Sequence, residues 1–266
     1  MSTTQVGSHT VYYDDSGTGH PILLMSGLGS TRLGWWKQVE PFSNKFRVIN
    51  MDNRDAGDSA LGTGPYTIAD MAEDVAGVIQ NLNLGRTHIV GISMGGMIAQ
   101  ELAIRHPELV DKLVLVSTTA GGPTGVNAKP EIAALLMRPA DEDIETRVRR
   151  TFTAIAGEGY MATHPQDLDQ IVKNATAKPM SPESYQRQLG ACMVHFSKGV
   201  ADRLAQIAAP TLVVHGDGDP LIPYPNGQYL AAHIKGARLA TYPGVGHLSP
   251  IEAPERFNRE VIEFLG

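Results

Sequence analysis

A serine between two glycines, placed where an apolar strand pattern meets a helical pattern, constrains the fold of this chain more than any other feature. Residues 88–92 are rich in β-branched and apolar side chains, and they run into Gly91-Ile92-Ser93-Met94-Gly95. A helical pattern follows and stops at Pro107. The two glycines let strand and helix approach where a side chain would clash, so that Ser93 projects its hydroxyl from a strained bend. Gly-x-Ser-x-Gly also arises by chance, but this context predicts a nucleophilic serine.

The length and charge of the chain exclude some classes of partner. With 266 residues, the chain can bury one large core, and α/β proteins of this size commonly form a single domain with an insertion. Charged residues make up 19% of the chain and the formal net charge is -6. The longest basic cluster is Arg147-Val148-Arg149-Arg150. No polyanion-binding surface is therefore indicated, and we expect no nucleic-acid partner.

Cysteine usage and the first residues indicate the compartment. Cys192 is the only cysteine, so neither an intrachain disulfide nor a cysteine-based metal site can form. Residues 1–10 lack the basic start and apolar segment of a secretory signal, and no apolar run approaches the length of a membrane span. We expect a soluble, unprocessed, cytoplasmic protein with no membrane partner. The sequence does not predict its oligomeric state.

Short apolar strand patterns alternate with helical patterns over most of the chain. Because strands joined through helices make right-handed crossovers, this alternation predicts an α/β fold with a mostly parallel sheet covered by helices on both faces. Residues 4–15 alternate polar and apolar side chains around Gly7-Ser8, which predicts an antiparallel hairpin at the sheet edge. Thr67 and Asp70 predict a capped helix start. Further strands are expected at residues 21–25, 46–51, 112–117, 211–215 and 238–242, and further helices at residues 36–43, 226–234 and 254–264.

This alternation breaks between residues 120 and 200. The segment begins with Gly121-Gly122-Pro123 and holds helical patches at residues 132–137 and 144–155, but no convincing buried strand. We interpret the segment as a helical insertion that lies over the sheet. The predicted organisation is an α/β core of residues 1–120 and 201–266 with a helical cap of residues 121–200.

A serine hydroxyl is a poor nucleophile at neutral pH, so it needs a base and a third group that orients the base. Among nine histidines, His247 is the best candidate for the base. It follows the expected strand 238–242 in Gly244-Val245-Gly246-His247, and open α/β sheets build their sites in loops at the carboxyl ends of strands. The remaining histidines lie where structural or solvated roles are typical: His9, His20, His88, His106, His164, His195, His215 and His233.

The acid is expected in the loop after the strand 211–215, which offers Asp217 and Asp219. Asp219 is preferred because two more residues let the chain turn over the sheet edge. Asp217 lies in a glycine-flanked turn, where its side chain would cap backbone amides. Either carboxylate could reach His247. The chain order of serine, then aspartate, then histidine matches the order expected for this architecture.

An oxyanion that develops on a carbonyl needs preset N–H donors. One donor is expected to be the backbone N–H of Met94, which follows the nucleophile at the helix start. The second is expected from the loop after the strand 21–25, Ser26-Gly27-Leu28-Gly29, with the N–H of Leu28 as the preferred group. Both are backbone groups, so the side chains at these positions matter little. No metal or organic cofactor is expected.

These residues together resemble the α/β-hydrolase superfamily, and the resemblance covers nearly the whole chain outside residues 120–200. Besides the serine motif, residues 52–59 are similar to the Asp-x-Arg-x-x-Gly-x-Ser loop of that family, residues 211–223 to its acid-bearing loop, and Gly246-His247 to its histidine loop. The resemblance supports Asp219 and implies that the insertion is a cap over the pocket. Many relatives carry His-Gly where this chain has Ser26-Gly27. In having serine at this position, the chain is similar to some enol-lactonases and to polyketide methylesterases.

The expected reaction is hydrolysis of a small, largely apolar carboxylic ester or lactone through an acyl-enzyme, because the insertion is rich in soft apolar residues and we expect few of its charges to face the pocket. An enol-lactonase, a carbon–carbon bond hydrolase or a perhydrolase would use the same three residues. A non-catalytic ligand receptor is the alternative from another class. A dehalogenase or epoxide hydrolase would need a carboxylate at position 93. The expected substrate contacts are Gly27, Trp36, Met137, Phe152 and Met193.

Overall fold

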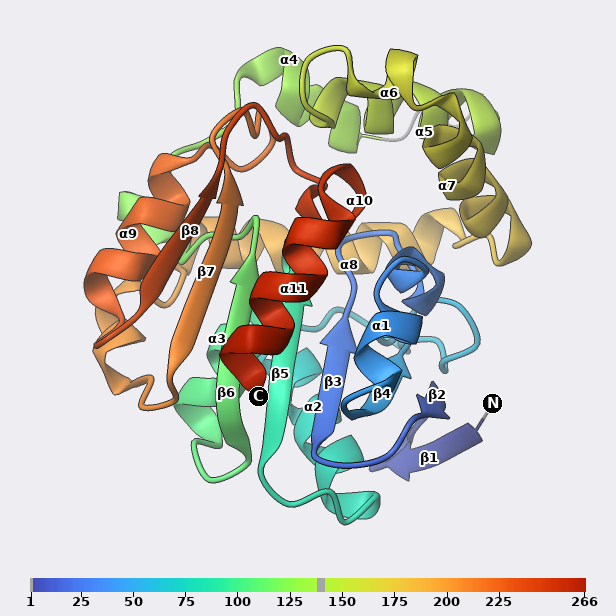
Figure 1. Cartoon of the computed structure of the whole chain (residues 1–266). Coiled ribbons are helices and arrows are strands. Elements are labelled where there is room, and N and C mark those ends of the chain that lie inside the picture. The colour runs from blue at the N-terminus through green and yellow to red at the C-terminus, as the bar shows by residue number, and fades with distance from the viewer. Residues whose placement is uncertain (1, 138–141) are drawn as a thin grey trace.

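A sheet of eight strands forms the centre of the computed structural model, which describes residues 2–137 and 142–266 (Figure 1). The spatial order is β1-β2-β4-β3-β5-β6-β7-β8. The pairs β1–β2 and β2–β4 are antiparallel and all later pairs are parallel, which confirms the mostly parallel sheet and the edge hairpin. The strands are β1 (Ser2–Val6), β2 (His9–Ser16), β3 (Pro21–Met25), β4 (Arg47–Met51), β5 (Thr87–Ile92), β6 (Val110–Val116), β7 (Thr211–Gly216) and β8 (Arg238–Tyr242).

Helices cover both faces of this sheet, because successive side chains of each buried strand point to opposite faces. On β3, Leu23 and Met25 belong to one apolar cluster, whereas Ile22 and Leu24 belong to another. The first cluster packs beneath α2 (Ile68–Asn81), α3 (Met94–Arg105) and α9 (Pro225–His233), and the second beneath α1 (Val39–Ser43) and α11 (Pro254–Leu265). Thr67 and Asp70 form the expected capping box at the start of α2.

The segment between β6 and β7 is helical and lies over the carboxyl ends of the parallel strands (Figure 1). Its helices are called the inserted helices below. The amphipathic helices α5 and α7 pack against each other through Val148, Ile155 and Ile171, and this small cluster continues onto Leu248 and Ile251. The inserted helices are α4 (Pro130–Ala133), α5 (Ile144–Ile155), α6 (Tyr160–Thr163), α7 (Pro165–Ala177) and α8 (Pro182–Lys198).

Two helices differ in extent from those that the sequence predicts. The chain forms a 3-10 turn, η1 (Arg32–Trp35), and then the short α1, instead of one helix over residues 36–43. Pro41 lacks an N–H group and is tolerated only in the first turn of a helix, which explains why α1 begins at Val39. Residues 132–137 divide in the same way between α4 and a 3-10 turn. The remaining short helices are η2 (Gly122–Thr124), η3 (Ala134–Leu136), η4 (Ala201–Gln206) and α10 (Ser249–Glu252).

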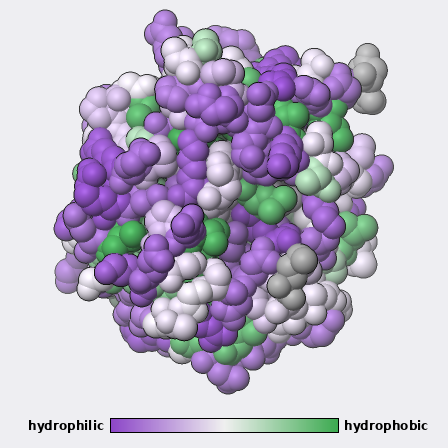
Figure 2. All heavy atoms as spheres, turned by 45° about the vertical axis from the view of Figure 1, so that its right-hand side comes forward, coloured by the Kyte–Doolittle hydropathy of each residue, from purple (hydrophilic) through white to green (hydrophobic). Residues whose placement is uncertain are grey.

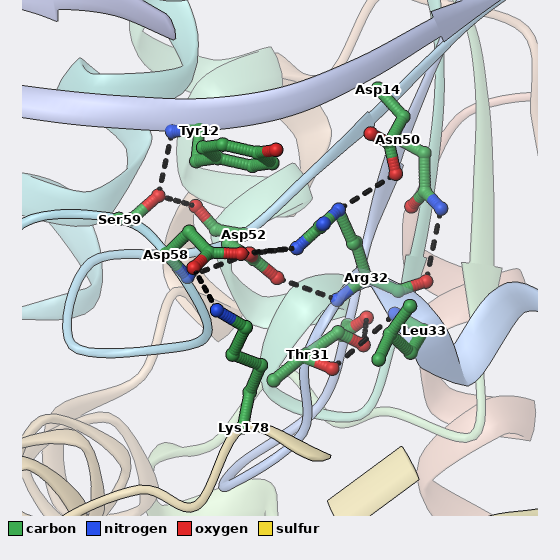
Figure 3. A network of polar contacts seen from close by, with 11 residues as sticks. Tyr12, Asp14, Thr31, Arg32, Leu33, Asn50, Asp52, Asp58, Ser59 and Lys178 are labelled. Atoms are coloured by element: carbon green, nitrogen blue, oxygen red, sulfur yellow. Dashed lines mark hydrogen bonds and ion pairs between the residues drawn. The ribbon is translucent and has the colours of Figure 1, made fainter. Parts of the chain in front are cut away.

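A network of buried charges fixes the loop after β4 (Figure 3). The guanidinium of Arg32 donates to Asp14 at 2.7 Å and to Asp52 at 2.6 Å. Asp52 is fully buried and also accepts the backbone N–H groups of Arg32 and Asp58. Arg54 instead pairs with Asp74 on the next helix, α2. These residues therefore hold the loop in place.

The same loop joins the sheet to the inserted helices by ion pairs. Asp55 is buried at a positive φ of 67° and receives two hydrogen bonds from the guanidinium of Arg187 on α8, at 2.6 and 2.9 Å. Asp58 pairs with Lys178, which follows α7 (Figure 3). Ser184 adds a third link, from its hydroxyl to Asp55. The position of α8 over the sheet is thus fixed by polar contacts as well as by apolar packing.

The surface carries no extended apolar area on the face that Figure 2 shows, where polar side chains surround small, separate apolar patches. None of the helices in the described ranges is long and apolar enough to cross a membrane. The exposed large apolar side chains of the described residues are Leu61, Val126, Met137, Met193 and Val194.

Candidate active site

Ser93 occupies a strained bend between β5 and α3. Its backbone has φ 56° and ψ -119°, a region that residues with a side chain rarely adopt. A Cβ atom on Gly91 would collide with the carbonyl oxygen of Gly95, and one on Gly95 would collide with the carbonyl oxygen of Met25. The N–H of Ser93 donates to Val116 of the neighbouring strand at 2.9 Å. The glycines are therefore required by the close approach of helix and strand, as the motif indicates.

Ser93 lines a cavity of about 190 Å³ between the sheet edge and the inserted helices. His247 lines the same cavity. The hydroxyl of Ser93 makes no hydrogen bond within the described residues, and its side chain is partly exposed. Among the expected substrate contacts, three line this cavity: Gly27, Trp36 and Phe152.

His247 and Asp219 form a buried pair. His247 Nδ1 lies 2.8 Å from Asp219 Oδ2, and because a carboxylate only accepts, Nδ1–H is the donor. Asp219 Oδ1 accepts the backbone N–H groups of Leu221 and Ile222, each at 2.9 Å. In this tautomer the other ring nitrogen, Nε2, is an acceptor, which is the form that a general base needs.

Asp219 is ionised although it is buried. Burial by itself would raise its pKa, but His247, which donates a hydrogen bond to the carboxylate, and the neighbouring His215 outweigh burial and hold the pKa below the ordinary 3.8. His215 Nε2 lies 3.5 Å from Asp219 Oδ2 and also 2.8 Å from the carbonyl oxygen of Ile222, so it packs behind the carboxylate. The negative charge of Asp219 therefore faces His247 at neutral pH.

The competing acid, Asp217, has a different place. It is exposed, and its Oδ1 accepts the N–H of Gly244 at 2.7 Å, so it caps the turn before the histidine loop. No hydrogen bond or ion pair joins Asp217 to His247 in the part of the chain that the structure describes. The structure thus pairs His247 with Asp219 and not with Asp217.

Two backbone N–H groups beside Ser93 have no acceptor within residues 2–137 and 142–266, those of Leu28 and Met94. The loop that carries Leu28 lies against the serine, because a Cβ atom on Gly27 would be 3.2 Å from Ser93 Cβ. Ser26 stabilises this loop from within, since its hydroxyl donates to the carbonyl oxygen of Thr31 at 2.9 Å. Free amides beside a nucleophile are the donors that an oxyanion requires.

Gln188 on α8 braces this loop, a role that the sequence analysis missed. Its side chain is fully buried, accepts the N–H of Gly29 at 3.0 Å and donates to the carbonyl oxygen of Arg54 at 2.9 Å. Ser184 and Cys192 lie one turn away on either side of it and are also buried. The sequence signal for this role is a glutamine between two residues of a buried helix stripe. A buried side-chain amide needs hydrogen-bond partners, so such a glutamine indicates a contact with a neighbouring segment.

Glu252 organises the histidine loop, and the sequence analysis missed it as well. Its carboxylate accepts the N–H groups of Gly246 and Leu248, which flank His247, at 3.0 Å each. It also accepts the N–H of Gly157 at 2.8 Å, just after α5. The backbone of His247 itself donates to the carbonyl oxygen of Ile155 at 2.8 Å. The histidine is therefore positioned jointly by the sheet and by the inserted helices.

We expect Gln188→Leu to lower kcat about tenfold with little change in KM. The variant removes the acceptor for Gly29 N–H and loosens the loop that presents Leu28 N–H, which is a loss of about 1.4 kcal/mol in the transition state. Gln186→Leu is the matched control, because Gln186 is exposed on the same helix. Steady-state kinetics measure both values. Equal losses in the two variants, or a loss confined to KM, would contradict a positioning role.

Two of the expected substrate contacts, Met137 and Met193, are not among the residues that line the cavity. Met193 is 57% exposed, because it follows Cys192 on α8 and is turned about 100° away from that cavity-lining residue. Met137 is 59% exposed and ends the turn in which Leu135 and Leu136 face the cavity. A methionine in a helical segment indicates neither the cavity side nor the solvent side.

One group of side chains within the described ranges has the spacing of metal ligands, and it lies far from Ser93 along the strands. Ligand atoms of His20, His88 and Asp111 are within 4.8 Å of one another, at the amino ends of β3, β5 and β6. Burial lowers the pKa of His88 to about 4, so its ring is neutral at pH 7. His20 pairs with Asp111 at 3.2 Å. This cluster is at the end of the sheet opposite the cavity and takes no part in chemistry at Ser93.

Comparisons with known proteins agree with this architecture. Residues 20–254 match the family model of the alpha/beta hydrolase fold. A 2-hydroxy-6-oxononadienedioate/2-hydroxy-6-oxononatrienedioate hydrolase of Burkholderia vietnamiensis is 34% identical over 96% of this chain and 90% of its own length. The 3-oxoadipate enol-lactonase 2 of Acinetobacter baylyi is 30% identical over 91% of this chain and 87% of its own. The crystal structure of the enol-lactonase from Burkholderia xenovorans superposes with a TM-score of 0.85 at 26% identity, covering 99% of both chains.

The chain therefore belongs to the α/β-hydrolase fold family. It is a hydrolase, and it is similar to enol-lactonases and to a 2-hydroxy-6-oxononadienedioate/2-hydroxy-6-oxononatrienedioate hydrolase. The family resemblance seen in the sequence is thereby confirmed.

Proposed function

We propose that the protein hydrolyses a small carboxylic ester or lactone through an acyl-enzyme on Ser93. The observation that carries this proposal is the strained serine at the cavity wall, with His247 on the same cavity and Asp219 hydrogen-bonded behind that histidine. A serine held in this conformation costs stability, and such strain persists where function maintains it. The inserted helices, residues 121–200, would serve as the cap that closes the cavity.

The proposed reaction has two steps, acylation and deacylation, and His247 transfers protons in both. Its Nε2 takes the proton of Ser93 Oγ while Oγ attacks the carbonyl carbon, and the N–H groups of Leu28 and Met94 stabilise the oxyanion. The tetrahedral intermediate collapses, and the imidazolium gives its proton to the departing alcohol or enol oxygen. Water, deprotonated by His247, then attacks the acyl carbon. Collapse of this second intermediate breaks the bond to Ser93 Oγ, which takes the proton back from His247 as the acid leaves. Asp219 stabilises the imidazolium in both steps without taking the proton.

A carbon–carbon bond hydrolase is the second candidate. The observation that favours it is the 34% identity to the Burkholderia vietnamiensis hydrolase, together with a cavity that would serve either reaction. Chromogenic esters, an enol-lactone and a 2-hydroxy-6-oxo dienoate assayed side by side would rank the two activities.

Covalent labelling tests the proposal directly. We expect p-nitrophenyl esters of two to eight acyl carbons to be hydrolysed, and a fluorophosphonate to add to one residue, Ser93, with loss of activity. Mass spectrometry of the labelled peptide measures the position. Ser26 and Ser30 also line the cavity and serve as internal controls. Label on either of them, or ester turnover that survives complete labelling, would overturn the assignment of the nucleophile.

A further inference from the structure

The cavity contains a positive charge that the proposed reaction does not use. No aspartate or glutamate is among its described lining residues, whereas two cationic side chains are, Lys178 and Arg147. The ammonium group of Lys178 is paired with Asp58. Arg147 has no carboxylate within ion-pair distance in the described part of the chain.

Arg147 belongs to the inner side of α5. Val148, Thr151 and Phe152 of the same helix line the cavity with it, and Arg147 itself is only partly exposed. Within the described residues its guanidinium makes one hydrogen bond, a long one of 3.5 Å from Nη1 to the carbonyl oxygen of Glu142.

The carboxylate of Glu142, whose backbone carbonyl contacts Arg147, is already engaged. The carboxylate of Glu142 receives two hydrogen bonds from Arg150, at 2.8 and 2.9 Å, in the fork geometry that arginine and carboxylate prefer. An unpaired guanidinium beside apolar side chains loses hydration without gaining a partner. An anion in the cavity would supply that partner.

Thr151 provides a second polar group at the same place. It lies one helical turn after Arg147, and residues four apart on a helix face are neighbours, with Cβ atoms about 5 to 6 Å apart. Its hydroxyl makes no hydrogen bond to any described residue, and it lines the cavity. A guanidinium and a free hydroxyl one turn apart fit the two oxygens of a carboxylate.

We infer that Arg147 and Thr151 form a carboxylate subsite, and that the substrate is an ester or lactone with a free carboxylate at the end remote from the scissile bond. This inference rests on the proposed function, since it places the reacting carbonyl at Ser93. Apolar side chains such as Phe152 and Leu135 lie in the same lining and suit an aliphatic chain between the two ends. The largely apolar substrate expected from the sequence would then carry a negative charge at one end.

Matched ester pairs test the subsite. The substrates are p-nitrophenyl monoesters of glutaric, adipic and suberic acid, each compared with its ω-methyl ester, which has nearly the same shape and no charge. We expect wild-type kcat/KM to favour the free acid about tenfold or more for at least one chain length. In Arg147→Gln this preference should vanish while turnover of the methyl esters changes less than threefold. Thr151→Val should reduce the preference by a smaller factor.

Arg149→Gln is the matched control. Arg149 lies on the same helix, pairs with Glu145 and Asp169 at the surface, and does not line the cavity. It leaves Glu142 bound to Arg150, and the Glu145 and Asp169 carboxylates that it frees do not line the cavity. This variant should keep the wild-type preference. A wild-type enzyme that favours the methyl esters at every length, or a preference that survives Arg147→Gln, would overturn the subsite.

A binding measurement keeps the subsite testable apart from the reaction. Monomethyl adipate and dimethyl adipate are titrated into Ser93→Ala protein, with and without Arg147→Gln, and heat or the shift in Tm is recorded. Binding of the monoacid alone, lost in the Arg147→Gln background, supports the subsite even if no ester is turned over. Equal binding of both compounds rejects the subsite. If the fluorophosphonate still labels Ser93 in the wild-type protein, the proposed function is unaffected by that result.

Discussion

Replacement of Ser93 by alanine is expected to abolish hydrolysis, with kcat lower by on the order of 10⁶-fold, which in practice means the background rate. Alanine keeps the Cβ atom and removes only the oxygen that attacks the carbonyl, so that no acyl-enzyme can form. The measurement is hydrolysis of the best ester of the panel, with fluorophosphonate labelling in parallel. Residual activity within a hundredfold of wild type would show that another group is the nucleophile. A wild type no faster than Ser93→Ala on every ester would instead favour a receptor that only binds its ligand.

Two further variants separate chemistry from stability at this position. Ser30→Ala removes a different hydroxyl from the same cavity and should change kcat less than threefold. Ser93→Gly also lacks the nucleophile, but glycine tolerates φ 56° and ψ -119°. We therefore expect Ser93→Gly to unfold at a higher temperature than Ser93→Ala by about 2 to 4 °C, for about 1 kcal/mol of strain relieved. Equal melting temperatures would argue that the bend stores little energy.

Much of the fold could be predicted because the sequence repeats simple local signals. Apolar runs of five to seven residues, each followed by a loop, gave the parallel strands, and the antiparallel hairpin followed from alternation around Gly7. Residues at the carboxyl ends of those strands meet at one edge, which is why Asp219 and His247 could be chosen from the sequence. Asp219 is preferred over Asp217 because it lies two residues further along the loop and because glycines flank Asp217.

The inserted helices could be predicted only as helices. Their lining depends on how each helix is rotated over the sheet, and that rotation is fixed by ion pairs such as Asp55 with Arg187, between residues 132 positions apart. Met193 therefore faces solvent while its neighbour Cys192 faces the cavity. Arg147, read as part of a basic cluster, proves to be on the inner side. Gln188 was missed because its two partners belong to loops far away in sequence.

Replacement of Asp219 by asparagine is expected to lower kcat by about 10⁴-fold while the protein stays folded. The asparagine side chain is nearly isosteric, but its amide N–H can donate to His247 Nδ1. That contact would favour the tautomer in which Nε2 carries the proton and can no longer accept one from Ser93. Asp219 is ionised in its buried place, so the substitution also removes the charge that stabilises the imidazolium.

Asp217→Asn is the matched control, because it changes the neighbouring carboxylate in the same loop. Asp217 is exposed and contacts only the turn at Gly244, so we expect kcat within threefold of wild type and a small change in Tm. Steady-state kinetics on one ester, with circular dichroism to verify folding, give the comparison. Similar losses in both variants would mean that the loop, and not the pair of Asp219 with His247, is what the reaction requires. A large loss in Asp217→Asn alone would show that Asp217, and not Asp219, is the acid. The sequence leaves this possibility open, since either carboxylate could reach the histidine.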